Sequence, residues 1–424
     1  MHINNLEISM KTSAILLFIL ISFSTLAQTE TEVVPPYNIK TTTFVQNNEN
    51  VVPIFELGSG FQFQFDDLFG NEANYYYEIV HCDYNWKPTD IPKTEYLKGF
   101  DGQRIQEYEN SFNTLQTYSH YRLPIPNQNT QLRISGNYIL KILDENKDVV
   151  FSRKFILYED LVSVPMQIRR ARTANYLESK HNIEFSVKSQ AINFQNPMKN
   201  VKVVLFQNGQ FNTAIKNIAP QYTIGNELIY KYDTETQFWA GNEFLYFDNN
   251  NIRSAANNIS KIESSSGIYS SHLYTNNARA NYPYSLIPDV NGNFVARNVS
   301  AEKNEIEADY AWVYFSLSAP AFMSKKSIYV TGMFNNYSLS PEYKMDFNPK
   351  NNLYEKAVLI KQGFTNYQYQ IADDKGNVDG EKAIDGNFWQ TENDYSILVY
   401  YRENSDRYDR VIGKATANSN VITN

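Results

Sequence analysis

The 424-residue sequence has a single cysteine, Cys82, so no disulfide can form within one chain. The fold must therefore be held by buried side chains. Free cysteine is among the most buried residue types, and we expect Cys82 to lie in the interior as an inert thiol. The five histidines are scattered, and no two of them have the short spacing typical of zinc ligands.

Positive charge is also scarce, with 38 basic against 46 acidic residues and a net charge of −8. The densest basic run is Arg169–Arg172. Nucleic-acid binding requires a basic face that displaces phosphate counterions, so we expect no nucleic-acid partner. Aromatic residues reach 15 % of the chain, which excludes a disordered protein. The length predicts two to four domains.

The longest apolar run lies close to the N-terminus. Lys11 precedes apolar residues 14–23, and Ser24-Thr25-Leu26-Ala27 follows with small residues at the −3 and −1 positions. This pattern predicts a signal peptide over residues 1–27, with cleavage after Ala27 and export of the chain. The run is too short to span a bilayer, so we expect no helical anchor. Met10-Lys11 is a more usual opening for a leader, which leaves Met1 and Met10 both open as the start.

Alternation of apolar and polar residues dominates the rest of the chain and predicts half-buried strands. Asn, Gly, Asp and Pro clusters separate these segments at spacings typical of antiparallel sandwiches. We therefore predict an all-β fold of tandem antiparallel immunoglobulin-like β-sandwiches. The predicted strands are 61–65, 75–80, 138–143, 151–158, 182–188, 201–206, 228–232, 244–247, 312–317, 327–331, 354–359, 367–371 and 395–401. Apolar residues between Ile252 and Ile262 indicate either a short helix or an ordered loop.

Two polar stretches, 159–166 and 300–307, have the composition of linkers. They divide the mature chain into predicted sandwiches over residues 28–160, 161–303 and 304–410. The remaining residues, 411–424, are rich in Ala, Thr, Asn and Ser, and we predict a disordered tail there.

Motifs for chemistry are weak. Gly58-Ser59-Gly60 leads into a strand instead of a helix, so it predicts a turn and no phosphate-binding loop. Residues 81–83 (His-Cys-Asp) alternate between the two faces of a strand and cannot converge on one ion. The acidic clusters at 66–67, 373–374 and 379–381 are the only motivation for a hydrolase hypothesis, and the second is more simply a turn. We therefore predict a non-enzymatic protein, with no catalytic, metal-binding or cofactor-binding residue and no small-molecule substrate.

The third predicted domain carries a recognisable order of segments: Tyr329–Tyr337, Tyr354–Leu359 and Phe364–Ile371. This order resembles the early-set immunoglobulin-like sandwich of glycogen-binding and isoamylase-type modules. Those modules stack a tryptophan on sugar after a Phe-Asn pair, whereas this sequence has Tyr337 there and a separate Trp389. The resemblance motivates an alternative function, a periplasmic carbohydrate-binding module, with these two rings as its candidate platform.

The first predicted domain has a more specific pattern of segments in one order. These are Phe65–Leu68, Tyr77–Trp86, Glu95–Phe100, Tyr108–Thr114, His120–Pro124, Ser135–Tyr138 and Ser152–Phe155, followed later by Ile306–Tyr310. Together they resemble the type IX secretion system plug protein family of Bacteroidota.

This resemblance implies a periplasmic protein, peripherally associated with the outer membrane. Its partner would be the outer-membrane translocon barrel, whose periplasmic end it closes when no substrate is engaged. The sequence does not identify the partner-binding residues. For four aromatic residues in the family-like segments, Trp86, Tyr96, Tyr118 and Tyr121, we expect packing roles, and for Arg122 and Arg153 paired interior charges.

Overall fold

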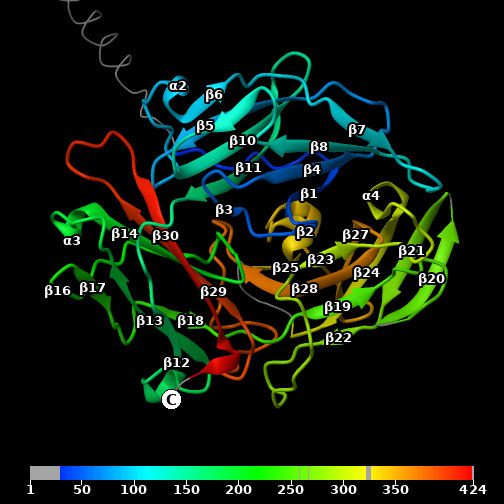
Figure 1. Ribbon diagram of the computed structural model, residues 1–424. Helices are drawn as coiled ribbons and strands as arrows, with labels where there is room; N and C mark the ends of the chain where they lie inside the picture. The colour runs from blue at the N-terminus through cyan, green and yellow to red at the C-terminus, as the bar shows by residue number, and fades with distance from the viewer. Residues whose placement is uncertain (1–28, 257, 266, 321–325, 423–424) are drawn as a thin grey trace, which may run out of the picture.

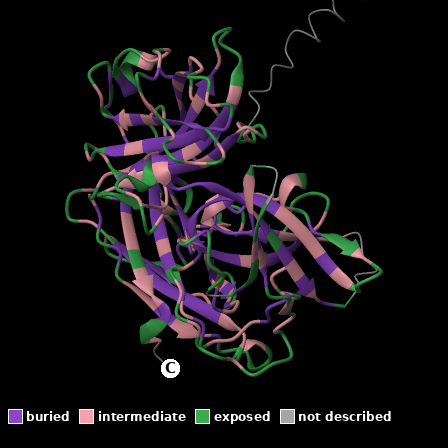
Figure 2. Cartoon of the chain, turned by 90° about the vertical axis from the view of Figure 1, so that its right-hand side faces the viewer, coloured by how far each residue is buried: buried purple, intermediate pink, exposed green. Residues whose placement is uncertain are grey.

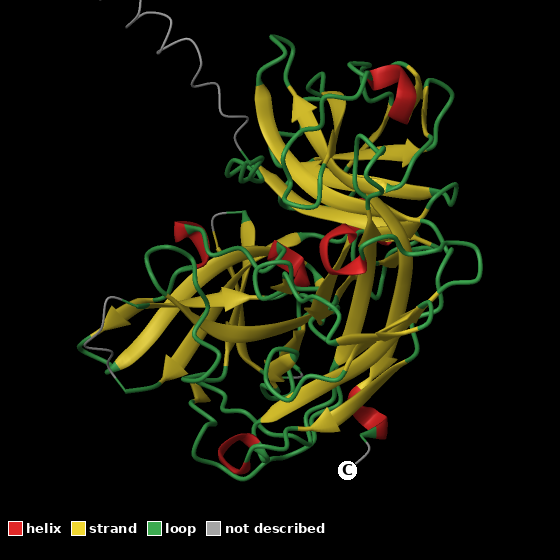
Figure 3. Ribbon diagram, turned by 90° about the vertical axis from the view of Figure 1, so that its left-hand side faces the viewer, coloured by secondary structure: helices red, strands yellow, loops and turns green. Residues whose placement is uncertain are grey.

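The computed structural model describes residues 29–256, 258–265, 267–320 and 326–422. Strands dominate this part of the chain, and all helices in it are single turns (Figures 1 and 3). The prediction of an all-β fold with antiparallel sheets is confirmed, and each predicted strand overlaps an observed one. No helix among the described residues is long and apolar enough to cross a membrane. The predicted signal peptide, residues 1–27, lies outside the described residues.

The first sandwich packs two main sheets around a core rich in phenylalanine and tyrosine. One sheet has the order β2-β1-β4-β8-β7, and the other β3-β11-β10-β5, in which β3 pairs parallel to β11. The bounds are β1 Ile39–Gln46, β2 Glu49–Asn50, β3 Ile54–Glu56, β4 Phe61–Asp67, β5 Tyr76–Cys82, α2 Lys93–Tyr96, β6 Leu97–Gly99, β7 Glu107–Asn110, β8 Ser119–Ile125, β9 Thr130–Leu132, β10 Gly136–Leu143 and β11 Val149–Tyr158. On β4, alternate residues Phe61, Phe63 and Phe65 fill the core, which turns the polar residues between them outward.

The second sandwich combines two distant parts of the sequence. One sheet has the order β12-β13-β17-β16, with β18 also paired to β13. The facing sheet, β15-β14-β29-β30, includes the last two strands of the chain. The bounds are β12 Met166–Arg170, η1 Ala174–Tyr176, β13 Lys180–Lys188, α3 Pro197–Asn200, β14 Val201–Gln207, β15 Ile215–Lys216, β16 Tyr222–Ile224, β17 Glu227–Tyr230, β18 Gln237–Trp239, β29 Asp394–Tyr401, β30 Arg410–Asn418 and η4 Ser419–Val421.

The third sandwich is built from the chain between β18 and β29. Its large sheet has the order β20-β21-β24-β27-β26, and β28 pairs with β19, β23 and β25 on the opposite side of the core. Two pairings are parallel, β21 and β22 with β24. The bounds are β19 Leu245–Asp248, β20 Ile259–Ser265, β21 Ile268–Leu273, β22 Asn276–Asn277, β23 Phe294–Ala296, α4 Asn304–Glu307, β24 Tyr310–Ser318, β25 Ser327–Thr331, η2 Met333–Asn335, η3 Pro341–Tyr343, β26 Asp346–Asn348, β27 Leu353–Lys361 and β28 Gly363–Ala372.

Two sequence predictions differ from the structure, and a third, which left a short helix and an ordered loop open, is resolved against the helix. The prediction of a disordered tail over residues 411–424 was wrong for its described part, because residues 410–418 form β30 and pair along β29. The 303/304 boundary does not separate two sheets, since β19 and β23 pair with β28 and β29 pairs with β14. The segment 252–262 forms no helix in its described residues; a turn is followed by β20. The apolar residues whose spacing suggested a helix lie partly in this turn and partly in β20.

Candidate functional site: a buried ionic junction

The outer face of the β4 sheet packs against the third sandwich, and a carboxylate lies between them. Asp66 on β4 is fully buried. Its Oδ1 accepts a hydrogen bond from Nδ1 of His120 at 2.6 Å. Its Oδ2 accepts from Nζ of Lys361 at 2.7 Å and from the hydroxyl of Tyr310 at 2.6 Å. Asp66 therefore joins β8 of its own sandwich to β27 and β24 of the third.

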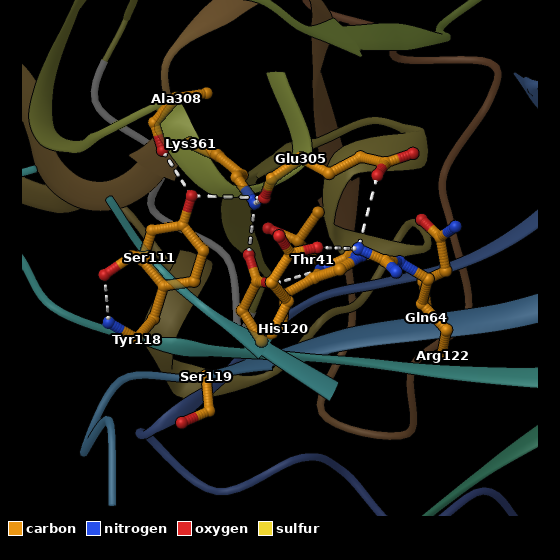
Figure 4. A network of polar contacts seen from close by, with 12 residues as sticks. Thr41, Gln64, Ser111, Tyr118, Ser119, His120, Arg122, Glu305, Ala308 and Lys361 are labelled. Atoms are coloured by element: carbon orange, nitrogen blue, oxygen red, sulfur yellow. Dashed lines mark hydrogen bonds and ion pairs between the residues drawn. The ribbon is translucent and has the colours of Figure 1, made fainter. Parts of the chain in front are cut away.

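Lys361 is held by groups from both sandwiches. Its Nζ also donates to the backbone oxygen of Glu305 at 2.6 Å, and it lies 4.3 Å from the ring centroid of Tyr118 on the first sandwich. The hydroxyl of Tyr118 in turn donates to the backbone oxygen of Ala308 at 2.8 Å (Figure 4). A buried ammonium is tolerated when it is paired and hydrogen-bonded in this way.

The electrostatics of this junction favour the charged pair. Burial alone would raise the pKa of Asp66, but Lys361 and His120 outweigh it and hold that pKa below its ordinary value. Burial lowers the pKa of Lys361, and the charge of Asp66 opposes this effect. Burial and the same carboxylate raise the pKa of the Tyr310 hydroxyl far above its ordinary value, which keeps it a hydrogen-bond donor. We call Asp66, His120, Tyr310 and Lys361 the ionic junction.

A more exposed set of charges surrounds the ionic junction. Arg122 on β8 donates to Glu109 at 2.9 Å and pairs with Glu305 at 3.5 Å. Lys303 reaches Glu109 from the third sandwich at 2.8 Å. Arg122 is paired, as predicted, but it lies partly exposed at this rim and not in the interior. These rim pairs are solvent-screened and contribute less than the buried pair.

A bulge in β1 completes the junction. Thr41 has φ of 51°, a left-handed conformation that is unusual for a β-branched residue, and its hydroxyl lies 2.6 Å from that of Tyr310. The next backbone oxygen, of Thr42, accepts from Arg153 at 2.9 Å and from Asn336 of the third sandwich at 3.3 Å. The bulge borders a cavity of about 710 Å³ between the sandwiches. Contacts on both sides therefore hold a strained backbone in place.

The residues expected to have packing roles lie as predicted. Trp86, Tyr96, Tyr118 and Tyr121 are all buried, and Arg153 is buried beside Glu32. Cys82 is buried as well, and burial raises its pKa to about 12, which makes its thiol unreactive.

The sugar platform suggested by the sequence does not form. Tyr337 is buried, with its hydroxyl 3.4 Å from the backbone oxygen of Asn208. Trp389 lies under the guanidinium of Arg170 at 4.1 Å and is not a neighbour of Tyr337 in any observed ring contact among the described residues. The 373–374 pair forms the expected turn, in which Asp373 accepts from the backbone N–H groups of Lys375 and Asn377.

Sequence reasoning missed the ionic junction. Asp66 was noted in an acidic pair, and Asp66, His120 and Tyr310 each lie in a segment that resembles the plug family, but no contact among them was predicted. Lys361 was not noted at all. The available signal was an acidic residue at the end of a strongly aromatic strand, Phe61–Phe65, where an outward position would ordinarily face water. Nothing local indicated that a second sandwich covers this face.

Comparison with known proteins finds a family match for the first sandwich. Residues 39–159 match the family model described as "Type 9 secretion system plug protein 1st domain". A crystal structure of a hypothetical protein from Parabacteroides merdae ATCC 43184 is similar over 91 % of this chain and 98 % of its own, with 29 % identity and a TM-score of 0.86. No curated protein matches. Over residues 39–159, the first sandwich of this chain therefore matches the first domain of the type 9 secretion system plug proteins.

Proposed function

We propose that this protein is the periplasmic plug of a type IX secretion system. It binds the periplasmic end of the outer-membrane translocon barrel and closes it while no substrate is engaged. The observation that carries this proposal is the match of residues 39–159 to the plug-protein first domain. The signal-peptide pattern of residues 1–27 supports export to the periplasm. The protein acts through a binding surface and not through catalysis.

The way the sandwiches are joined suits such a role. A plug must present one shape to the mouth of a pore, so its domains cannot turn freely. The first sandwich is held to the third by the ionic junction and to the second by a buried apolar cluster that includes Trp86, Phe206 and Tyr400. Because both contacts are buried, reorientation of the first sandwich would break them together.

Binding is tested by purifying the tagged full-length protein from gently solubilised outer membranes and identifying the proteins that accompany it. We expect a very large barrel protein in near-equal amount, and more of it when export substrates are depleted. A preparation with no barrel protein would refute the proposal.

Closure needs a separate measurement. Cells lacking this protein should admit a large antibiotic that the intact outer membrane excludes, and a copy of the gene should restore exclusion. The control strain carries the variant Val421→Ala, which changes an exposed side chain near the described C-terminal end. If the barrel co-purifies but antibiotic uptake is unchanged in the deletion strain, this protein binds the barrel without closing its pore.

A further inference from the structure

Two exposed phenylalanines lie on neighbouring loops of the first sandwich. Phe69 is in the β4–β5 loop and is 66 % exposed. Phe112 is in the β7–β8 loop and is also 66 % exposed, and Leu115 of the same loop is 45 % exposed. Single exposed apolar residues are ordinary on a protein surface, but a group of them on adjacent loops indicates an interaction site. We call Phe69, Phe112 and Leu115 the loop patch.

The two loops touch one another. Gln116 of the β7–β8 loop donates from Nε2 to the backbone oxygen of Leu68 at 3.1 Å. Gly70 approaches Thr117 so closely that a β-carbon at Gly70 would lie 3.3 Å from Oγ1 of Thr117. The residues on either side of Phe69 therefore contact the β7–β8 loop, and the loop patch is one surface.

Contacts from the third sandwich hold the β7–β8 loop in one shape beside α4 (Figure 1). The backbone N–H of Phe112 donates to the backbone oxygen of Ile306 at 2.9 Å. The buried carboxylate of Asp309 accepts from the backbone N–H of Leu115 at 2.6 Å and from that of Gln116 at 3.1 Å. A loop that is fixed before binding loses less conformational entropy when a partner docks, so the exposed side chains are preorganised.

The charged side chains next to the loop patch are mainly acidic. The bases that reach this region, Arg122 and Lys303, both pair with Glu109, and Arg122 also pairs with Glu305. The other carboxylates on the two loops, on β7 or in contact with them form no ion pair among the described residues. A partner surface that complements this charge is basic. These other carboxylates are Asp67, Glu72, Glu107 and Asp309.

We propose that the loop patch docks this protein on the translocon barrel, with both phenylalanine rings in an apolar hollow bordered by lysine or arginine side chains. The proposal rests on the plug function proposed above and names contact residues for it. Both loops lie within residues 39–159, which match the plug-protein first domain. Aromatic rings at the centre and charged groups at the rim are the usual arrangement of a protein interface. The rings provide affinity, and the acidic rim orients the approach.

The test repeats the co-purification with the full-length protein carrying Phe69→Ala/Phe112→Ala. We expect the recovered barrel protein to fall at least tenfold, because both anchoring rings are lost. Both side chains are exposed, so the urea midpoint should stay close to that of wild type, which separates loss of binding from loss of folding. The matched control is Phe100→Ala, which removes a ring of similar exposure, 73 %, next to β6 and away from β7 (Figure 1). This control should recover the barrel as wild type does.

A second variant tests the charge of the rim without removing a ring. Glu72→Gln should lower the recovered barrel about threefold at low salt, and high salt should narrow the difference from wild type because it screens the rim. The matched control is Glu49→Gln, an exposed glutamate on β2 at the opposite edge of the same sheet, which should behave as wild type. Equal losses for the two variants would overturn the assignment of a basic partner surface.

A photo-crosslinking phenylalanine analogue in place of Phe112 identifies the contact directly. We expect an adduct with a very large barrel protein. If wild type and the double phenylalanine variant recover equal amounts of barrel, the docking assignment is overturned while the plug function stands. An adduct between two copies of this chain would also overturn it, by assigning the loop patch to a dimer. If wild type itself recovers no barrel protein, the plug function fails and the docking assignment fails with it.

Discussion

The first sandwich is held by two interfaces of opposite character. Against the third sandwich it buries the ionic junction around Asp66. Against the second it buries apolar side chains from β3, β5, β10 and β11 on one side and β14, β29 and β30 on the other. Figure 2 shows that buried positions continue from the strands of one sandwich into the next. The interface with the third sandwich thus adds a buried ion pair to a small cluster of Leu68, Tyr118, Tyr310 and Leu359, whereas the interface with the second sandwich is mainly apolar.

The difference separates adhesion from orientation. Apolar burial is non-directional and tolerates small displacements. The ionic junction requires Asp66, Lys361 and His120 at hydrogen-bond distance, and a buried charge that loses its partner is costly. The second sandwich therefore provides much of the adhesion, and the third sets the angle of the first.

The largest expected effect is at the ionic junction. Asp66→Asn removes the charge that compensates Lys361, and we expect it to lower the free energy of unfolding by about 3–5 kcal/mol. Urea unfolding followed by tryptophan fluorescence measures this change. The double variant Asp66→Asn/Lys361→Met should recover most of the loss, because no unpaired charge remains. A loss below about 1 kcal/mol for the single variant would contradict the assignment of a charged junction.

Acid should lower the stability of the protein in two stages. Burial lowers the pKa of His81 and His181 to about 4, so both stay neutral in the folded protein. Below pH 6.5 the unfolded chain takes up protons that the folded one excludes. The free energy of unfolding therefore falls between pH 6.5 and 4, by up to about 3 kcal/mol per histidine. Asp66, with its lowered pKa, keeps its charge through this window and loses it only below its ordinary value of 3.8.

The variant His181→Gln isolates the contribution of one histidine to this loss of stability in acid. In the wild-type protein this imidazole bridges Tyr395 at 2.8 Å and the backbone oxygen of Trp389 at 2.7 Å. The variant should be less stable at pH 7 but lose less stability on acidification, as followed by urea midpoints from pH 7 to 4.5. Curves for wild type and variant that run parallel would show that His181 does not titrate in this window.

A smaller effect is expected from a polar group within the apolar interface. The hydroxyl of Tyr400 donates to Asn137 Oδ1 at 2.7 Å across this interface. Tyr400→Phe leaves that oxygen without this donor and should lower the free energy of unfolding by about 1–2 kcal/mol. The loss is smaller than for Asp66→Asn because no buried charge is left unpaired. The control Tyr274→Phe, at an exposed site, should stay within about 0.5 kcal/mol of wild type in the same urea titration. Equal effects of the two variants would contradict the role of the buried bond.

The strands could be predicted from the sequence because alternation is a local property. Phe61–Phe65 and Tyr367–Ile371 show it plainly, and both are strands. The partners of those strands could not be predicted, since pairing is decided by packing between distant segments. β14 pairs with β29 nearly two hundred residues later, and the polar segment 300–307, which suggests a linker, forms α4 against the first sandwich.

The candidate site was hidden for the same reason. Asp66 and Lys361 are 295 residues apart, and neither has an unusual neighbour in sequence. Composition correctly predicted a buried Cys82, because that expectation concerns the residue type alone. The resemblance to carbohydrate modules was misleading at Tyr337, where it suggested an exposed ring. Burial of that ring depends on the second sandwich, whose Asn208 backbone accepts from its hydroxyl.

Cys82 provides a chemical probe that can separate the two interfaces. It lies within the apolar interface, and its raised pKa of about 12 leaves little thiolate at pH 8. We expect slow maleimide labelling of the folded protein. Tyr400→Phe should speed labelling about tenfold, because 1.4 kcal/mol of weakened packing changes an opening equilibrium by that factor. Asp66→Asn should leave the labelling rate within about twofold of wild type if only the junction with the third sandwich loosens. Equal acceleration in both variants would instead mean that the three sandwiches open as one unit, and the contrast between the interfaces would then apply to their chemistry alone.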